Sequence, residues 1–246
     1  MDIRHYLDST YLKTAHQAGI PEAENRRVAL ALVREAIDEG FKLAMIRPEY
    51  VEEAKTMVRE ANSTLAIGTV IDFPDGTSEL ETKLVEAQKA IDAGADELDF
   101  VCNYRAFLAG DEELVRREIL EGTSLGLEHL KVVKWIIEVA AMDLGQVARF
   151  SSLIKSVVVS NFDGHYNEVF VKSSTGFYQT ENGAPNGATE ETIIAMLENA
   201  SPLPVKAAGG VRTFEEAVRM INLGVKRIGT SAAKAIADGG ASTNAY

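Results

Sequence analysis

Two lysines occupy the positions of this sequence that are best suited to chemistry. Lys172 ends the apolar run 169–171, Lys206 follows Pro204 and Val205, and small residues and glycine come soon after each lysine. Short apolar, β-branched runs predict buried strands, and a lysine buried there is costly unless it is paired or used. If the two ammonium groups converge, each disfavours the charge of the other, and one becomes a free amine near neutral pH. Such an amine can form a Schiff base with an aldehyde or a ketone.

Carboxylates accompany these lysines at the candidate strand ends. Asp99 lies in the run 97–101, where strand alternation places it on one face with Glu97, and Leu98 with Phe100 on the other. A carboxylate within so apolar a run is expected to be paired or functional, although a salt bridge to a neighbouring helix is a structural alternative. We interpret Glu97 as a solvated or structural charge at the start of the strand. Asp8, near the end of the first candidate strand, joins Asp99 as a candidate.

Two glycine-containing loops predict a phosphate site. The segment 208–213 leads from a strand into a helix N-terminus, where backbone amides can face an anion, and Gly229-Thr230-Ser231 follows the last strand. Barrel enzymes often hold phosphate between the loops after strands seven and eight. Gly176, shortly after Lys172, permits a further close approach of the backbone.

The elements that must position these residues alternate strictly between strand and helix. We expect strands at 6–9, 42–46, 65–73, 97–102, 131–137, 168–172, 204–207 and 226–230. We expect helices at 22–39, 78–93, 112–125, 144–159, 189–199 and 213–223. This order predicts an α/β protein, a single (β/α)8 TIM barrel over 1–246 with an N-terminal helical addition and a flexible tail at 238–246. An open doubly wound sheet is the alternative, but no Gly-x-Gly-x-x-Gly turn follows an early strand.

Composition narrows the class of protein. With 37 acidic and 25 basic residues among 246, the net charge of -12 disfavours a nucleic acid or an anionic membrane as partner. Cys102 is the only cysteine, and the four histidines lack metal-ligand spacing, so we do not expect a metal site. Schiff-base chemistry on a lysine, with proton transfer by neighbouring side chains, would need no organic cofactor either. The N-terminus lacks the apolar segment of a secretory signal, which makes a cytoplasmic protein the default expectation. Association into a homo-oligomer is left open by the sequence.

Several of these motifs together resemble a known enzyme family. Lys172-Ser173-Ser174-Thr175-Gly176 combined with Lys206-Ala207-Ala208-Gly209-Gly210 is similar to the pattern of the deoxyribose-phosphate aldolases, which are class I, Schiff-base aldolases on a TIM barrel. The resemblance extends from about residue 7 to residue 236. It implies reversible cleavage of 2-deoxy-D-ribose 5-phosphate to acetaldehyde and D-glyceraldehyde 3-phosphate.

The resemblance also implies a role for each candidate residue. Lys172 would be the Schiff-base nucleophile, and Lys206 would lower the pKa of Lys172 and relay protons. Asp99 would act through a water as general acid and base, and Asp8 would hold Lys206 in place. The implied phosphate-binding residues are Thr175, Gly176, Gly209, Gly210, Val211, Arg212, Gly229 and Ser231. Tyr246, at the end of the tail, is a candidate proton relay if the tail folds over the barrel mouth; a disordered chain end is the alternative.

Two rival functions remain. Another Schiff-base barrel enzyme could act on a different phosphorylated sugar or on a keto acid, although a keto acid would require a carboxylate-binding site that we do not identify. A non-catalytic phosphosugar-binding barrel would keep the phosphate loops, but it would have no use for Asp99, Lys172 and Lys206 together.

Overall fold

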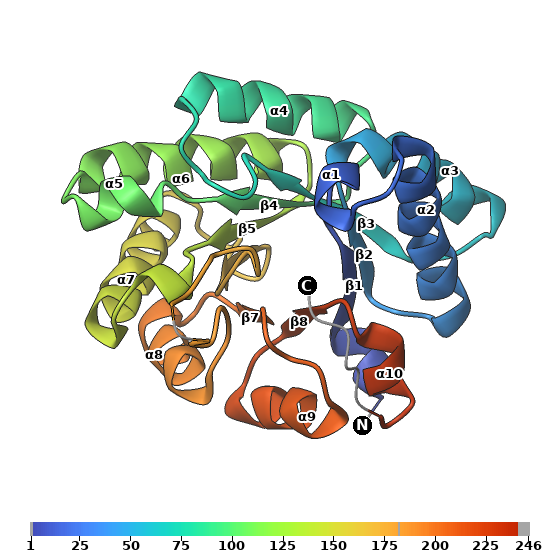
Figure 1. Cartoon of the computed structure of the whole chain (residues 1–246). Helices are drawn as coiled ribbons and strands as arrows, with labels where there is room; N and C mark the ends of the chain where they lie inside the picture. Colours follow the sequence, from blue (N-terminus) through green and yellow to red (C-terminus); the bar gives the residue numbers. More distant parts are fainter. Residues whose placement is uncertain (1, 182, 241–246) are drawn as a thin grey trace.

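Eight parallel strands form a closed barrel in the computed structural model, which describes residues 2–181 and 183–240 (Figure 1). The strands are β1 (Leu7–Tyr11), β2 (Leu43–Ile46), β3 (Ala66–Ile71), β4 (Glu97–Val101), β5 (Val132–Ile136), β6 (Val169–Lys172), β7 (Val205–Ala208) and β8 (Arg227–Thr230). They follow one another around the barrel in chain order, and β8 pairs with β1 to close it. The predicted (β/α)8 barrel is therefore confirmed, and the open sheet is excluded.

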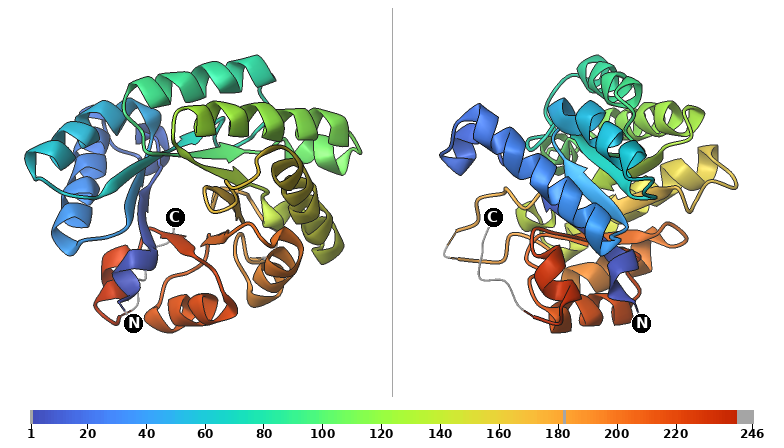
Figure 2. Two further views of the ribbon diagram at one scale, coloured as in Figure 1. Left: turned by 180° about the vertical axis from the view of Figure 1, so that it is seen from behind. Right: turned by 90° about the vertical axis from the view of Figure 1, so that its right-hand side faces the viewer.

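Helices surround the barrel on its outer side (Figure 2). The α-helices are α1 (Ala15–Ala18), α2 (Glu22–Glu39), α3 (Val51–Glu60), α4 (Leu80–Asp92), α5 (Tyr104–Leu108), α6 (Glu112–Glu128), α7 (Leu144–Asn161), α8 (Glu190–Ala200), α9 (Phe214–Leu223) and α10 (Ala233–Ala237). Three short 3-10 turns are η1 (Ile3–Tyr6), η2 (Pro48–Tyr50) and η3 (Val139–Ala141). The expected N-terminal helical addition is thus the single turn η1.

Local sequence signals account for the helix ends. Thr189 and Thr213 each form a capping box, with Thr192 and Glu216 respectively, at the starts of α8 and α9. Gly40 ends α2 with a φ of 67°, the left-handed conformation that glycine adopts most readily. The same conformation at Asp72, with a φ of 53°, explains why β3 ends before residue 73, where we expected it to extend.

The alternation of side chains along the strands produces two apolar regions. Leu98, Phe100 and Trp135 belong to the large core between barrel and helices, where the Phe100 and Trp135 rings stack with centroids 4.8 Å apart. A smaller cluster of Leu12, Leu43, Met45 and Val70 packs with Phe73 and Phe177. Leu43 and Met45 alternate with Ala44 and Ile46 of the outer core, so the smaller cluster lies on the inner side of the barrel wall.

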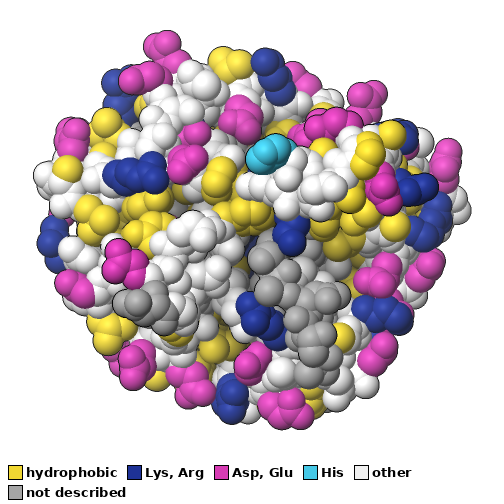
Figure 3. Space-filling model, viewed as in Figure 1, with side chains coloured by type: hydrophobic (Ala, Val, Ile, Leu, Met, Phe, Trp, Pro, Cys, Tyr) yellow, Lys and Arg dark blue, Asp and Glu magenta, His cyan; other side chains and the backbone are white. Residues whose placement is uncertain are grey.

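Loops at the carboxyl ends of the strands project from one end of the barrel. The loop between β6 and α8 and the short α1 extend on the same side (Figure 2, right). Acidic and basic side chains are interspersed around the rim of the face seen in Figure 3. Within the described ranges, no helix combines the length and apolar character needed to cross a bilayer.

Candidate active site

The strand register brings Lys172 and Lys206 together. They are direct partners in the β6–β7 ladder, and both are buried. Lys172 Nζ lies 2.8 Å and Lys206 Nζ 2.9 Å from the same oxygen, Asp99 Oδ2. The convergence of the two lysines, which the sequence suggested, is therefore present in the structure, and Asp99 is the carboxylate that they share.

Further charges complete a buried group, which we call the lumen cluster. Lys134 Nζ lies 2.7 Å from Asp99 Oδ1 and 2.5 Å from Glu97 Oε2. Its seven members are Asp8, Glu97, Asp99, Lys134, Lys172, Lys206 and Arg227. Lys206 Nζ also lies 2.7 Å from Asp8 Oδ2. Arg227 contacts Asp8 Oδ1 at 2.6 Å and Glu97 Oε1 at 3.1 Å.

Charge balance in the lumen cluster favours a free amine. Three carboxylates face four basic groups, so the cluster carries one excess positive charge when every group is ionised, and releasing one proton balances it. Lys172 is the group from which that proton leaves most easily: burial, together with Lys206 and Lys134, lowers its pKa to about 8 despite its contact with Asp99. Burial alone would raise the pKa of Asp99, but Lys134, Lys172 and Lys206 outweigh it and hold that pKa well below its usual range.

Two sequence-based interpretations need correction. Asp8 is the second residue of β1, not its end, and lies level with Gly229 of β8, so its carboxylate is inside the barrel below the mouth. Of the two roles predicted for Glu97, the solvated charge is wrong and the structural charge agrees with the structure: Glu97 is buried and ion-paired with Lys134 and Arg227. Both differences arise because the lumen of the barrel is filled by polar side chains from the strand starts as well as from their ends.

Lys134 and Arg227 were not predicted as site residues. Lys134 interrupts the apolar run 132–137, and strand alternation directs it inward beside Asp99, its direct partner in the β4–β5 ladder. A lysine that interrupts an apolar strand is the sequence signal from which Lys134 could have been predicted as a site residue. Arg227 at the start of β8 gives no such signal, because a basic residue before an apolar run is common at exposed strand starts.

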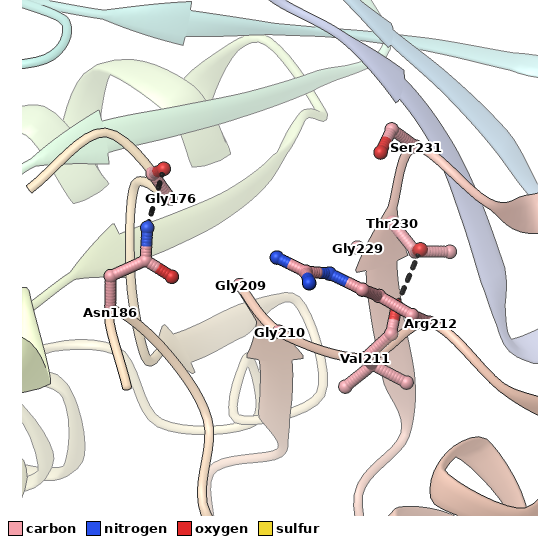
Figure 4. Close-up of a pocket in the computed structure, with 9 residues that line it drawn as sticks. All are labelled: Gly176, Asn186, Gly209, Gly210, Val211, Arg212, Gly229, Thr230 and Ser231. Carbon is pink, nitrogen blue, oxygen red and sulfur yellow. Dashed lines mark hydrogen bonds between the residues drawn. The ribbon is translucent and has the colours of Figure 1, made fainter. Parts of the chain in front are cut away.

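A pocket beside the lysines brings together most of the residues predicted to bind phosphate, and we call it the phosphate pocket after that prediction (Figure 4). Its lining consists of Gly176, Asn186, Gly209, Gly210, Val211, Arg212, Gly229, Thr230 and Ser231. All the predicted phosphate residues except Thr175 line it. Asn186 and Thr230 are additions, with Asn186 Nδ2 donating to the Gly176 carbonyl at 3.1 Å and Thr230 Oγ1 donating to the Val211 carbonyl at 2.7 Å.

Glycine is required in the wall of this pocket. Gly209 has a φ of 79°, and a Cβ there would lie 2.9 Å from Gly187 Cα. A Cβ on Gly229 would lie 3.1 Å from Lys206 Cε, which shows how closely the pocket adjoins the lumen cluster. The Arg212 guanidinium extends across the pocket toward Asn186 (Figure 4). Backbone amides and a guanidinium suit an anion, so a bound phosphosugar could place its other end at the lysines.

Two predicted residues are not among those that line the pocket. Thr175 turns away from the pocket, and its hydroxyl donates a hydrogen bond to Glu138 Oε2. Tyr246, the candidate relay, lies outside the described residues, as does most of the expected tail 238–246.

Comparison with known proteins gives a consistent result. Residues 24–239 match the family model described as DeoC/LacD family aldolase. A deoxyribose-phosphate aldolase of Thermococcus gammatolerans is 37% identical over 240 residues, covering 97% of this chain and 96% of the relative. The corresponding protein of Lactiplantibacillus plantarum is 34% identical over 237 residues, covering 96% and 99%. The solved tetrameric deoxyribose phosphate aldolase of Aeropyrum pernix superposes with a TM-score of 0.77 at 32% identity, covering 96% of this chain and 89% of that one.

Proposed function

The chain belongs to the DeoC/LacD family of aldolases, and we propose that it cleaves 2-deoxy-D-ribose 5-phosphate reversibly to acetaldehyde and D-glyceraldehyde 3-phosphate. The observation that carries this proposal is the buried Lys172, whose pKa is lowered to about 8 and whose Nζ shares Asp99 Oδ2 with Lys206. A free amine, an adjacent proton carrier and a neighbouring anion pocket are the three parts that Schiff-base cleavage of a phosphosugar requires.

Lys172 begins the reaction as the nucleophile. Its neutral Nζ attacks C1 of the open-chain aldehyde, and loss of water from the carbinolamine gives an iminium. The iminium accepts the electron pair of the C2–C3 bond when a base removes the proton of the C3 hydroxyl. Glyceraldehyde 3-phosphate then leaves, and an enamine of acetaldehyde stays on Lys172.

Asp99 and Lys206 move the protons. Asp99 Oδ2 receives hydrogen bonds from both lysines, so it can pass protons between them and, through a water, to the substrate. Protonation of the enamine at C2 and hydrolysis of the resulting iminium release acetaldehyde and restore the amine. Asp8 holds Lys206 from the opposite side at 2.7 Å. General acid–base catalysis of this kind is worth roughly 10²–10⁴ in rate.

Reductive trapping tests the proposal directly. The protein is incubated with acetaldehyde and borohydride, and its peptides are mapped by mass spectrometry; we expect a reduced adduct on Lys172. Lys172→Ala should lose this adduct, whereas Lys226→Met, which replaces an exposed lysine before β8, should keep it. The complete absence of an adduct in the parent protein would favour a non-catalytic phosphosugar-binding barrel.

Self-association and a cytoplasmic location are further parts of the proposal. The Aeropyrum pernix relative is described as tetrameric, and α6 presents the exposed apolar side chains Leu114 and Leu120. We expect light scattering after size exclusion to give a multiple of the 26.7 kDa chain mass. A monomer mass at micromolar concentration would contradict self-association without affecting the proposed reaction.

A further inference from the structure

Glu138, just beyond β5, combines two unfavourable features. Its backbone is left-handed, with a φ of 58° and a ψ of 67°, although it is not glycine. Its carboxyl group is buried, and Oε1 has no hydrogen-bond partner among the residues that the structure describes. Burial raises the pKa of Glu138 to about 7, against the opposing effects of Thr175 and Lys172. Both the left-handed backbone and the buried carboxyl group of Glu138 are energetically unfavourable, which indicates that this residue has a function at this position.

The other oxygen of Glu138 holds the loop that follows Lys172. Glu138 Oε2 accepts hydrogen bonds from the Thr175 hydroxyl and from the Thr175 backbone N–H, the latter at 3.2 Å. Thr175 Oγ1 in turn accepts the Phe177 N–H at 3.0 Å. The residue between them, Gly176, has a φ of 81° and lines the phosphate pocket. Glu138 therefore fixes the backbone on both sides of Gly176.

The remaining contacts of this loop come from both neighbouring strands. From the β5 side, the Val139 N–H donates to the Ser173 carbonyl at 2.9 Å. Ser173 Oγ donates to the Ala208 carbonyl of β7 and accepts its N–H, each at 2.9 Å. Asn186, which precedes α8, donates to the Gly176 carbonyl. Glu138 supplies side-chain contacts from the β5 side, at Thr175, so the path from Lys172 to Gly176 is held between two neighbouring strands.

We propose that Glu138 is a positioning residue that acts through Thr175 to keep Gly176 in the wall of the phosphate pocket. It would thereby determine how strongly the enzyme prefers a phosphorylated sugar, without taking part in the Schiff-base chemistry. This inference rests on the proposed aldolase function and adds a determinant of its substrate specificity.

Two matched variants distinguish the hydrogen bonds that the Glu138 side chain makes to Thr175 from the charge of its carboxylate. Glu138→Gly removes the side chain at a backbone conformation that glycine adopts without strain. Glu138→Gln keeps a side-chain oxygen that can accept both Thr175 bonds but has no carboxylate. Each is assayed for cleavage of 2-deoxyribose 5-phosphate and of unphosphorylated 2-deoxyribose, and for acetaldehyde trapping on Lys172.

The loss of two buried hydrogen bonds predicts a clear asymmetry. In Glu138→Gly, the KM for the phosphorylated sugar should rise about tenfold or more. Its kcat, its kcat/KM for 2-deoxyribose and its trapping should change by less than about threefold, and Glu138→Gln should resemble the parent. If circular dichroism shows that Glu138→Gly does not fold, Glu138→Asp provides the same comparison, because the shorter aspartate side chain does not reach Thr175.

Two outcomes would overturn the inference. An equal loss of kcat/KM on both sugars would place Glu138 in the chemistry or the general stability of the site, and an unchanged KM would show that the Thr175 contacts do not matter for phosphate binding. Failure of the parent protein to trap acetaldehyde is a different result, since it contradicts the proposed function itself.

Discussion

Replacing Lys206 by methionine should raise the pKa of Lys172. Each of the two ammonium nitrogens lies within 2.9 Å of Asp99 Oδ2, so they are separated by no more than about 6 Å. At an effective dielectric constant of about 20, two unit charges at this separation repel by about 3 kcal/mol. That repulsion corresponds to about two pKa units. Since burial, the largest cause of the lowered pKa, persists in the variant, we expect the new value to lie between about 9 and 10.

The pH dependence of acetaldehyde trapping measures this change. For the parent, the rate of borohydride-reduced adduct formation on Lys172 should rise with a midpoint near pH 8. The midpoint should move to about pH 9–10 in Lys206→Met. At pH 7 the fraction of free amine should fall from about a tenth by a factor of roughly 10–100.

Two control variants distinguish charge from proton transfer. Lys206→Arg keeps a positive charge, so the midpoint should stay near that of the parent, while turnover falls because arginine cannot release a proton. Lys226→Met removes an exposed lysine and should change neither quantity. If Lys206→Met left the midpoint where it is in the parent, the electrostatic account of Lys172 would be refuted.

Four other changes test separate parts of the structure. Lys172→Ala should abolish both cleavage and trapping while the circular dichroism spectrum is retained; substantial adduct on Lys206 in this variant would mean that the two lysines have been assigned the wrong way round. Lys134→Met leaves Glu97 and Asp99 without one of their buried cations, so it should lower the free energy of unfolding by about 3–5 kcal/mol, measured in urea. A loss below about 1 kcal/mol would show that the lumen cluster tolerates the missing charge. Gly209→Ala, at a φ of 79°, should raise the KM for the phosphorylated sugar with little effect on trapping, and an unchanged KM would place phosphate elsewhere. Because the pKa of Glu138 is raised from 4.5 to about 7 on folding, the contribution of Glu138 to stability is most favourable below pH 4.5 and declines as the pH rises to 7. Relative to Glu138→Gln, the free energy of unfolding of the parent should fall by about 3 kcal/mol over that range. Parallel pH profiles of the two proteins would exclude the raised pKa.

The sequence predicted those features that depend on local alternation. Apolar runs located all eight strands, and alternation along β4 correctly placed Asp99 on the face opposite Leu98 and Phe100, which belong to the outer core. The β6–β7 pairing then follows from strand order, which explains why Lys172 and Lys206 could be expected to meet.

What the sequence did not predict depends on contacts between distant strands. How deeply Asp8 lies is set by the stagger between β1 and β8, which no local pattern encodes. Thr175 follows Lys172 closely, yet its hydroxyl is directed by Glu138, a residue 37 positions earlier in a left-handed conformation that its residue type does not favour. Four helices were also missed. Helices α1, α5 and α10 have only four or five residues, which provide too little periodicity to identify a helix, whereas α3 was missed although it has ten.

Because β1 and β8 close the barrel, the Lys172 amine becomes reactive only late in the synthesis and folding of the chain. Asp8 and its partner Arg227 are 219 positions apart, so the lumen cluster cannot assemble until synthesis has passed residue 227. In an unfinished chain, Lys172 stays solvated and protonated like any other lysine and reacts poorly with the aldehydes around it. Copies that end before Arg227 are therefore expected to react with aldehydes at Lys172 no faster than at an ordinary lysine.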